Sequence, residues 1–268
     1  MKVAAILCTR NEALHVESTL RDLIAEGIEV ALIDHNSTDG TLDIARPFLG
    51  NGLISIEHLA FDGTFSLTSQ LQAKWNLAQR LNHDWLMHVD ADEWHMAPSV
   101  DLSLVEAIAQ VDRDGYNCIN FNEFVFVPGP GEDLTDCDYR RTSTRYYFFR
   151  PRYPFAVRAW RHDGTLDNRR NAGHLIDGDA RLYPIDFHMR HYIFLSEQHA
   201  REKYLARRFA QEEIERGWHG DKLRASSENL IFRNDSRIRT LSHWTSRDFD
   251  ISEPHWQHFW EWSDHHDL

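Results

Sequence analysis

Cysteine is scarce in this chain. Only three cysteines occur among its 268 residues, and Cys8, Cys118 and Cys137 lie far apart along the sequence. An odd number of widely spaced cysteines argues against a disulfide scaffold and supplies no Cys-x-x-Cys pair for a metal. This usage is typical of proteins in a reducing compartment. We therefore expect a soluble, cytoplasmic protein.

Long apolar runs are also absent. No stretch approaches the roughly 20 consecutive apolar residues that a helix needs to cross a bilayer, so we expect no transmembrane segment. The apolar run at residues 3–8 is too short for the apolar core of a signal peptide and is better explained as a first buried strand. The sequence contains neither an internal repeat nor a low-complexity linker.

Positive charge is in deficit. Lys and Arg number 29 against 42 Asp and Glu, which gives a formal net charge of −13. Bulk binding of nucleic acid is therefore not expected. A protein this acidic would gain from a divalent cation wherever it binds a phosphorylated ligand. The length and the 42% of hydrophobic residues fit one large globular domain, with or without an elaborated C-terminal part.

The first 90 residues alternate between short apolar runs and amphipathic helical patterns. Buried strands are predicted at residues 3–8, 30–33, 53–56 and 85–89, with a helical pattern after each of the first three. Alternating β and α elements imply a parallel sheet with right-handed crossovers. Further strands are predicted at residues 117–127 and 145–150. The predicted fold class is α/β, a mainly parallel Rossmann-type sheet flanked by helices, with an elaborated α+β C-terminal part.

Several residues have the chemistry of helix ends. Asn11 is expected to cap the first helix and Gly27 to end it. Ser196 is expected to start a long helix that runs to about Arg216 and is ended by Gly217.

Polar clusters follow three of the predicted strands directly, at residues 9–12, 34–37 and 90–93. The carboxyl ends of parallel strands share one edge of a sheet, so these clusters should converge. Buried carboxylates are costly unless they are paired, and the run of Asp90, Asp92 and Glu93 therefore indicates a cation or a positively charged partner. Hard oxygen ligands suit Mg²⁺ or Mn²⁺. A solvated acidic turn is the alternative, and three clusters in succession make it less favoured.

Together these segments resemble family 2 glycosyltransferases of the GT-A fold. The resemblance rests on residues 8–12 (CTRNE), 33–41 (IDHNSTDGT) and 89–93 (VDADE), in the expected order and spacing, and covers roughly residues 1–95. Further on, the sequence is similar to a His-Tyr…Ser-Glu…Lys segment of a bacterial branch of these enzymes. The matching residues there are His191, Tyr192, Ser196, Glu197 and Lys203.

The resemblance implies a nucleotide-sugar donor, with UDP or GDP, and a divalent metal, Mn²⁺ or Mg²⁺. By position, Asp92 would coordinate the metal between the donor phosphates, and Asp90 would approach the ribose or the metal. The residues implied near the nucleoside are Thr9, Arg10, Glu12 and Asp34. The alternative role of Asp34 is that of a turn former or helix cap. His35 stands where the family often has a second Asp, which leaves the choice between UDP and GDP open.

Other candidates follow from their positions in the chain. Lys74, on a predicted helix, is a candidate for the donor diphosphate, although a solvated position is the more favoured alternative. Since GT-A enzymes often add a later metal ligand, His191 is the candidate, with His188 and His174 as rivals.

An inverting enzyme also needs a base that removes the proton of the acceptor hydroxyl. Glu123 is the candidate because it interrupts an apolar strand, and the alternative is an outward-facing strand residue. Competing bases are Asp163, Asp177 and Asp179.

We therefore predict a metal-dependent, inverting glycosyltransferase that acts on a glycan, lipid-linked or small-molecule acceptor. Residues 1–95 would form the nucleotide-sugar-binding half and residues 96–217 the acceptor and catalytic half of one domain. Residues 218–268 would form a Trp-rich extension that docks as core in preference to stacking on sugars.

Two alternatives stay open. A nucleotidyltransferase would be expected to carry a glycine-rich phosphate loop where residues 9–12 stand, and those residues include no glycine. A non-catalytic sugar-nucleotide or glycan-binding module would not need both Asp92 and a nearby base.

Overall fold

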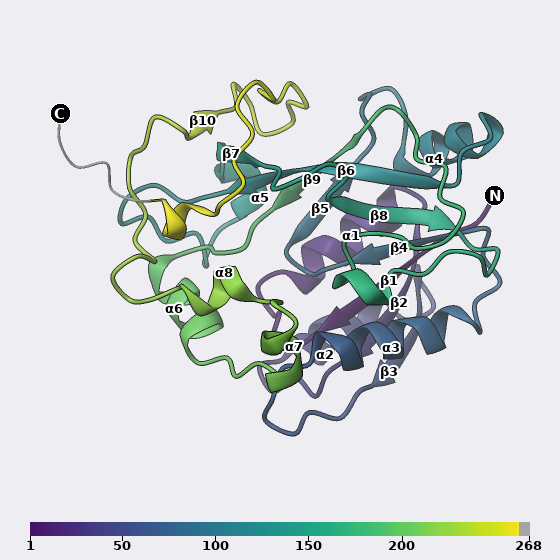
Figure 1. Cartoon of the computed structure of the whole chain (residues 1–268), viewed down its shortest axis with the longest axis horizontal. Helices are drawn as coiled ribbons and strands as arrows, with labels where there is room; N and C mark the ends of the chain where they lie inside the picture. The colour runs from purple at the N-terminus through teal and green to yellow at the C-terminus, as the bar shows by residue number, and fades with distance from the viewer. Residues whose placement is uncertain (263–268) are drawn as a thin grey trace. The chain divides into compact units, whose positions relative to one another are not determined.

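The computed structural model describes residues 1–262 of the chain, which divides into two compact units (Figure 1). Unit 1 consists of residues 1–122 and 154–190, and the described part of unit 2 consists of residues 123–153 and 191–262. The sequence predicts a division by function, into residues 1–95, 96–217 and 218–268, and that division stays a prediction.

A parallel sheet forms the centre of unit 1, as the sequence predicts. Its strands run in the spatial order β4-β1-β2-β3, and each neighbouring pair is parallel. The strands are β1 (Val3–Thr9), β2 (Glu29–Asp34), β3 (Leu53–His58) and β4 (Trp85–Val89). The connecting helices are α1 (Val16–Ala25), α2 (Thr41–Ala45), continued by the 3-10 turn η1 (Arg46–Phe48), and α3 (Leu67–Ala78).

The remaining strands of unit 1 extend this sheet in the antiparallel sense. β8 (Ala156–Arg161) pairs with β4, and the first half of β6 (Cys118–Phe126) pairs with β8. A short strand β5 (Glu93–Met96) pairs with β9 (Phe187–His191). The unit also contains α4 (Leu104–Arg113) and η2 (Arg169–Asn171). The sequence did not predict β8, because its apolar residues are interrupted by Arg158.

Both faces of the unit 1 sheet are buried. Val3, Ala5 and Leu7 of β1 pack with α1 and α4 on one face, whereas Ala4 and Ile6 pack with α3 on the other. Figure 1 shows α4 and α3 on opposite sides of these strands. Coverage on both faces explains why β1 is an almost continuous apolar run instead of an alternating one.

The ends of α1 agree with the prediction only in part. Gly27 follows the helix at φ +80° and its N–H bonds to the carbonyl of Ile24, as expected of a glycine terminator. The prediction that Asn11 caps the helix is wrong, because α1 begins at Val16 after a separate turn. The Asn11 side chain instead accepts a hydrogen bond from the Thr38 N–H at 2.8 Å. Asn11 therefore links the loops that follow β1 and β2.

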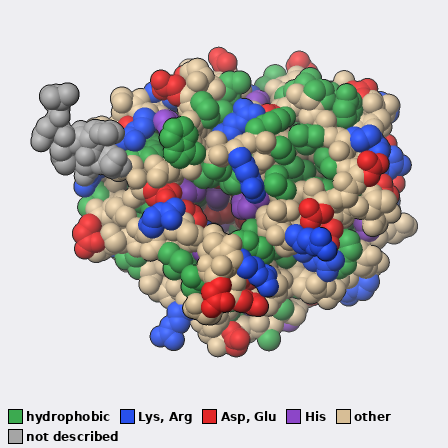
Figure 2. Space-filling view, viewed as in Figure 1, with side chains coloured by type: hydrophobic (Ala, Val, Ile, Leu, Met, Phe, Trp, Pro, Cys, Tyr) green, Lys and Arg blue, Asp and Glu red, His purple; other side chains and the backbone are tan. Residues whose placement is uncertain are grey.

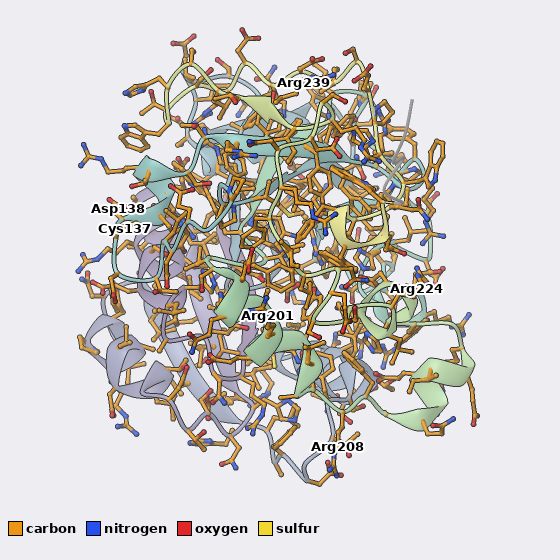
Figure 3. The ribbon with its side chains drawn as sticks, turned by 90° about the vertical axis from the view of Figure 1, so that its left-hand side faces the viewer. Cys137, Asp138, Arg201, Arg208, Arg224 and Arg239 are labelled. Carbon is orange, nitrogen blue, oxygen red and sulfur yellow. The ribbon has the colours of Figure 1, made fainter. Side chains whose placement is uncertain are left out.

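Unit 2 is built on the second half of β6, which pairs with β7 (Arg145–Phe149), followed by the short strand β10 (Arg239–Thr240). Its helices are α5 (Tyr139–Thr142), α6 (Glu197–Leu205), α7 (Gln211–Glu215), α8 (Gly220–Leu223) and the 3-10 turn η3 (Phe259–Glu261). Figure 3 shows α6 with its labelled residue Arg201.

The long helix predicted from Ser196 to Arg216 is wrong in its middle. Ser196 does cap α6, with its hydroxyl accepting from the His199 N–H at 3.1 Å, and Gly217 does follow α7 at φ +78°. Between the two helices, Ala210 adopts an extended conformation with ψ 130°, which interrupts the helical hydrogen bonds. The predicted helix is therefore two short helices.

Aromatic side chains form much of the interior of unit 2. Phe124 and Phe249 stack with ring centroids 3.8 Å apart, and His258 stacks between Phe149 and Trp260 at 3.9 and 4.4 Å. Part of the Trp-rich extension thus docks as core, as expected. Trp256 does not, since it is 73% exposed.

The surface mixes charges of both signs. On the face drawn in Figure 2, basic and acidic side chains are interspersed among polar and apolar ones. Across residues 1–262, none of the helices combines the length and the apolar character that crossing a bilayer requires.

Candidate active site

The three polar clusters meet at one edge of the unit 1 sheet. Thr9 at the end of β1 is the register partner of Asp34 at the end of β2. On the other side of β1, Leu7 pairs with Val89, so that Asp90 begins the loop directly beyond β4. Parallel pairing alone brings these residues together, because strands that run in one direction end at one edge.

Asp90 is surrounded by cationic and donor side chains. Its Oδ1 lies 3.6 Å from Lys74 Nζ and 3.6 Å from His88 Nε2, and its Oδ2 lies 3.5 Å from a terminal nitrogen of Arg158. Desolvation raises the pKa of this carboxyl, but Lys74, His88 and Arg158 together hold it well below its usual value. The Asp90 side chain is nevertheless 42% exposed.

Arg158 is the residue that the sequence analysis missed. Its side chain is 4% exposed and lies 2.5 Å from Glu93 Oε1, which is fully buried. Glu93 Oε2 in turn accepts the Asp90 N–H at 3.0 Å. Glu93 therefore holds the loop that carries Asp90 and does not point at solvent. The sequence feature that could have identified Arg158 is a single charged residue within an apolar strand, which is also the feature that identified Glu123 as a candidate.

Lys74 is buried, and the more favoured expectation that it is solvated is wrong. Its side chain is 7% exposed, and Nζ donates to the Val89 carbonyl at 3.1 Å and lies 3.2 Å from His88 Nε2. Burial and the Lys74 charge lower the pKa of His88 to about 3, so that the imidazole is neutral. The ammonium group is thus directed at the end of β4.

The loops beyond β1 and β2 are held together by hydrogen bonds. Arg10 donates to the carbonyls of His35 and Asn36 at 2.9 and 2.5 Å, and its guanidinium lies 3.3 Å from the Phe61 ring centroid. The Glu12 N–H donates to Thr41 Oγ1 at 2.8 Å. These contacts give the nucleoside-side candidates a defined geometry, and their roles remain predictions.

Asp34 behaves as the turn former that was its alternative role. Its carboxylate accepts the Ser37 N–H at 3.2 and 3.1 Å, and the residue is 1% exposed. Thr9 beside it is equally buried, and its hydroxyl has no hydrogen-bond partner among residues 1–262. A buried hydroxyl without a partner costs free energy, which a ligand at this edge could recover.

His35 is packed as a core imidazole. It is 2% exposed, its Nδ1 lies 3.1 Å from Gln70 Nε2, and its ring meets the edge of Phe61 at 5.2 Å. Burial, and then the Arg10 charge, lower its pKa. A neutral ring therefore occupies the position where the resemblance leads one to expect a second carboxylate.

The loop of residues 90–93, the acidic loop, carries the two aspartates that were predicted to lie near a metal. Asp92 is 7% exposed, next to the partly exposed Asp90. Within residues 1–262 no group of three or more His, Cys, Asp or Glu side chains is arranged to hold a metal ion. Mg²⁺ and Mn²⁺ commonly bind through one or two carboxylates and complete their shell with substrate phosphates and water. The side chains of residues 1–262 alone therefore provide no complete metal site, and any such ion would need oxygen ligands from a phosphorylated ligand and water.

In unit 2, the predicted base and the predicted later metal ligand contact each other. Glu123 Oε1 on β6 lies 2.6 Å from Nδ1 of His191, the last residue of β9, with side chains 5% and 18% exposed. Glu123 is therefore not an outward-facing strand residue. A carboxylate that bonds to Nδ1 fixes the orientation and the tautomer of an imidazole. This arrangement occurs in carboxylate–histidine pairs of acid–base catalysis and behind histidines that bind metals.

The rival candidates have local structural roles. Asp163 accepts from the hydroxyl of Thr165 at 2.5 Å, and Asp179, 84% exposed, pairs with Arg181. Asp177 accepts from Asn171 Nδ2 at 3.3 Å. His174 stacks on Phe155 at 4.7 Å, and His188 is half-buried on β9.

The chain resembles known glycosyltransferases. Residues 4–127 match the family described as Glycosyl transferase family 2. An uncharacterized glycosyltransferase of Rickettsia bellii (strain RML369-C) is 20% identical over 231 residues, which cover 85% of this chain and 73% of that protein.

Among solved structures, similar chains include S. aureus TarS. The crystal structure of TarS 1–349 in complex with UDP has a TM-score of 0.47 and 15% identity, covering 77% of this chain and 64% of that chain. A crystal structure of S. aureus TarS has a TM-score of 0.46 and 17% identity, covering 86% and 43%. The chain thus spans less than two thirds of these structures, and likeness at this level carries no argument about its chemistry.

Proposed function

We propose that this protein is a metal-dependent glycosyltransferase that moves a sugar from a nucleotide-sugar donor with inversion at the anomeric carbon, since residues 4–127 match the family described as Glycosyl transferase family 2. The observation that carries the proposal is the edge of the unit 1 sheet where Thr9 and Asp34 end β1 and β2 and Asp90 directly follows β4. We call this edge the rim. The family match covers every one of these residues.

The donor would bind at this rim with its diphosphate near the acidic loop. Asp92, with Asp90 beside it, would hold a Mn²⁺ or Mg²⁺ ion, which supplies Lewis-acid stabilisation for the departing nucleoside diphosphate. Lys74 and Arg158 keep Asp90 ionised, and Glu93 holds the backbone of its loop. The Thr9 hydroxyl and Arg10 are the proposed contacts to the nucleoside.

Glu123 is the proposed base. A carboxylate that is 5% exposed and bonded to an imidazole is held in one orientation, which favours proton transfer from an acceptor hydroxyl. The His191 ring would stabilise the ionised carboxylate before transfer. Alternatively, His191 would ligate the metal, and Glu123 would orient it from behind. A His191→Gln variant distinguishes these roles, because only the second predicts weaker binding of Mn²⁺.

The experiment that tests the proposal measures both donor binding and turnover. Thermal unfolding with UDP-, GDP-, CMP- and dTDP-sugars, with and without Mn²⁺, should reveal selective stabilisation by one nucleotide class that requires Mn²⁺. Hydrolysis of that donor should fall at least 100-fold in Asp92→Asn. The matched control is Asp101→Asn, an exposed aspartate in the following loop, which should hydrolyse the donor as the wild type does.

Equal turnover by wild type and Asp92→Asn would contradict metal-assisted transfer at this motif. The other two functions have their own signatures. A nucleotidyltransferase would release pyrophosphate from a nucleoside triphosphate, and a binding module would be stabilised by a donor without ever hydrolysing it.

A cytoplasmic location and the class of acceptor also belong to the proposal. Cys8, Cys118 and Cys137 are all free thiols, which supports a reducing compartment. The acceptor is proposed to be a glycan, a lipid-linked saccharide or a small molecule.

A further inference from the structure

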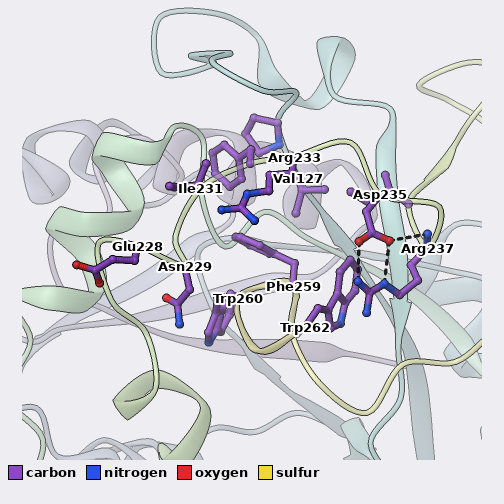
Figure 4. A pocket seen from close by; sticks show the side chains of 13 residues that line it. Val127, Glu228, Asn229, Ile231, Arg233, Asp235, Arg237, Phe259, Trp260 and Trp262 are labelled. Carbon is purple, nitrogen blue, oxygen red and sulfur yellow. Dashed lines mark hydrogen bonds and ion pairs between the residues drawn. The ribbon is translucent and has the colours of Figure 1, made fainter. Parts of the chain in front are cut away.

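Unit 2 contains a pocket that the proposed donor chemistry does not use. It lies between residues 127–128, the segment 228–238 and the final turn 259–262, as Figure 4 shows. It opens to solvent, and its empty volume is about 580 Å³ when the open mouth is included. The part of this space that water can occupy is about 90 Å³, several times the roughly 10–15 Å³ that one bound water needs, so the hollow is more than a packing defect.

The walls of this pocket are held rigidly. Arg237 bonds to Asp235 with both ends of its guanidinium, Nε to Oδ1 at 2.8 Å and a terminal nitrogen to Oδ2 at 2.6 Å. The same guanidinium lies 4.0 Å from the Trp262 ring centroid. The Trp262 indole N–H donates to the Gln257 carbonyl at 3.1 Å, and that of Trp260 donates to the Asp221 carbonyl at 3.0 Å. A pocket arranged in advance loses less entropy when it binds.

The charges of the lining cancel. Arg233 and Arg237 are opposed by Glu228 and Asp235, all of which line the pocket. A phosphate or carboxylate ligand would be bound best by an excess of positive charge, which this lining does not provide. The favoured ligand is therefore neutral.

The remaining lining combines apolar and polar surfaces. Phe259 and Trp262 contribute aromatic rings, Ile231 contributes an aliphatic side chain, and Asn229 adds an amide at the edge. A pyranose has the matching form, with a face of C–H groups that packs on apolar side chains and a rim of hydroxyls that bond to carboxylate, amide and guanidinium groups.

We propose that this pocket binds a neutral saccharide ring, and that the ring is part of the acceptor. The second half of this statement rests on the proposed function, whereas the first half does not. The acceptor class is thereby narrowed to glycans or glycolipids that carry an uncharged sugar.

The test uses an array of neutral and acidic oligosaccharides probed with the intact protein and three variants. Trp262→Ala removes one aromatic wall, and Ile231→Trp fills the cavity without removing any wall. Trp256→Ala is the matched control, since Trp256 lies in the same Trp-rich extension as Trp262, is 73% exposed and does not line the pocket. We expect the wild type and Trp256→Ala to bind neutral glycans, and both pocket variants to bind them at least tenfold more weakly.

A preference for acidic glycans, binding to no glycan, or wild-type binding by both pocket variants would overturn the proposal. Stabilisation by nucleotide sugars with Mn²⁺ is measured on the same proteins and should be unchanged in all three variants. If no nucleotide sugar stabilised the wild-type protein, the proposed function would be refuted, whereas the result on saccharide binding would still stand.

Discussion

Single buried charges carry much of the organisation of unit 1. The side chains of Arg158 and Glu93 are 4% and 0% exposed and form an ion pair. Glu93 also accepts a hydrogen bond from the backbone N–H of Asp90. Removing one partner of a buried pair leaves the other charge without compensation, and this costs far more than the net contribution of the pair.

We expect Arg158→Met to lower the free energy of unfolding by about 3–5 kcal/mol, because the buried Glu93 carboxylate would lose its arginine partner. Urea unfolding measures the change. Arg161→Met is the control on the same strand, since Arg161 is 48% exposed and its pair with Asp112 should contribute no more than about 1 kcal/mol. Similar losses in the two variants would contradict the role given to burial.

The cysteines should differ in reactivity. Burial raises the pKa of Cys8 to about 12 and that of Cys118 to about 11, whereas Cys137 is exposed just before α5 (Figure 3). Because the thiolate is the reactive species, a thiol reagent at neutral pH should modify one cysteine in the native protein and three after denaturation. In Cys137→Ser the native protein should not be modified. Rapid labelling of a second native cysteine would contradict this expectation.

At the scale of elements, helix ends were predictable where a side chain supplies the missing hydrogen bond. Ser196 and Gly27 agree with expectation for this reason. Asn11 does not, because a loop contact to Thr38 competes for its amide. The split between α6 and α7 was not predictable, since nothing in the local pattern marks Ala210 as extended.

α4 offers a direct test of capping. Ser103 and Glu106 form a reciprocal capping box, in which the Ser103 N–H donates to Glu106 Oε2 at 2.9 Å. We expect Ser103→Ala to lower the free energy of unfolding by about 1 kcal/mol, since the cap hydroxyl no longer accepts the Glu106 N–H. Ser242→Ala, at an exposed position, should be neutral within error of urea unfolding. Equal stability of the two variants would argue against the cap.

For the whole molecule, stability should depend on pH through buried histidines. Burial lowers the pKa of His258 to about 4, against the opposing charges of Asp221 and Glu123. The folded protein therefore binds fewer protons than the unfolded chain between this value and about 6.5. The contribution is complete above pH 6.5 and is lost as the pH falls towards 4. His88, with a pKa of about 3, acts in the same direction.

We expect the free energy of unfolding of the wild type to fall between pH 7.5 and pH 5.0, with about 2 kcal/mol of the loss due to His258. In His258→Gln the amide can still form a hydrogen bond with the Tyr147 hydroxyl, whose oxygen lies 2.8 Å from His258 Nδ1. That variant should lose about 2 kcal/mol less over the same range of pH. Parallel pH profiles for the two proteins would show that His258 titrates normally.

The sequence by itself determined the parallel core of unit 1 and the convergence of its polar strand ends. Periodicity reports which faces of an element are buried, and parallel strands necessarily end at one edge. Only the tertiary structure decided that Arg158 joins Glu93, 65 residues away, and that Glu123 meets His191, 68 residues away. It also decided that Lys74 is buried and that a pocket forms beside Trp262. Such contacts depend on how distant segments pack, and no local pattern of residues specifies the partner that a buried charge will find.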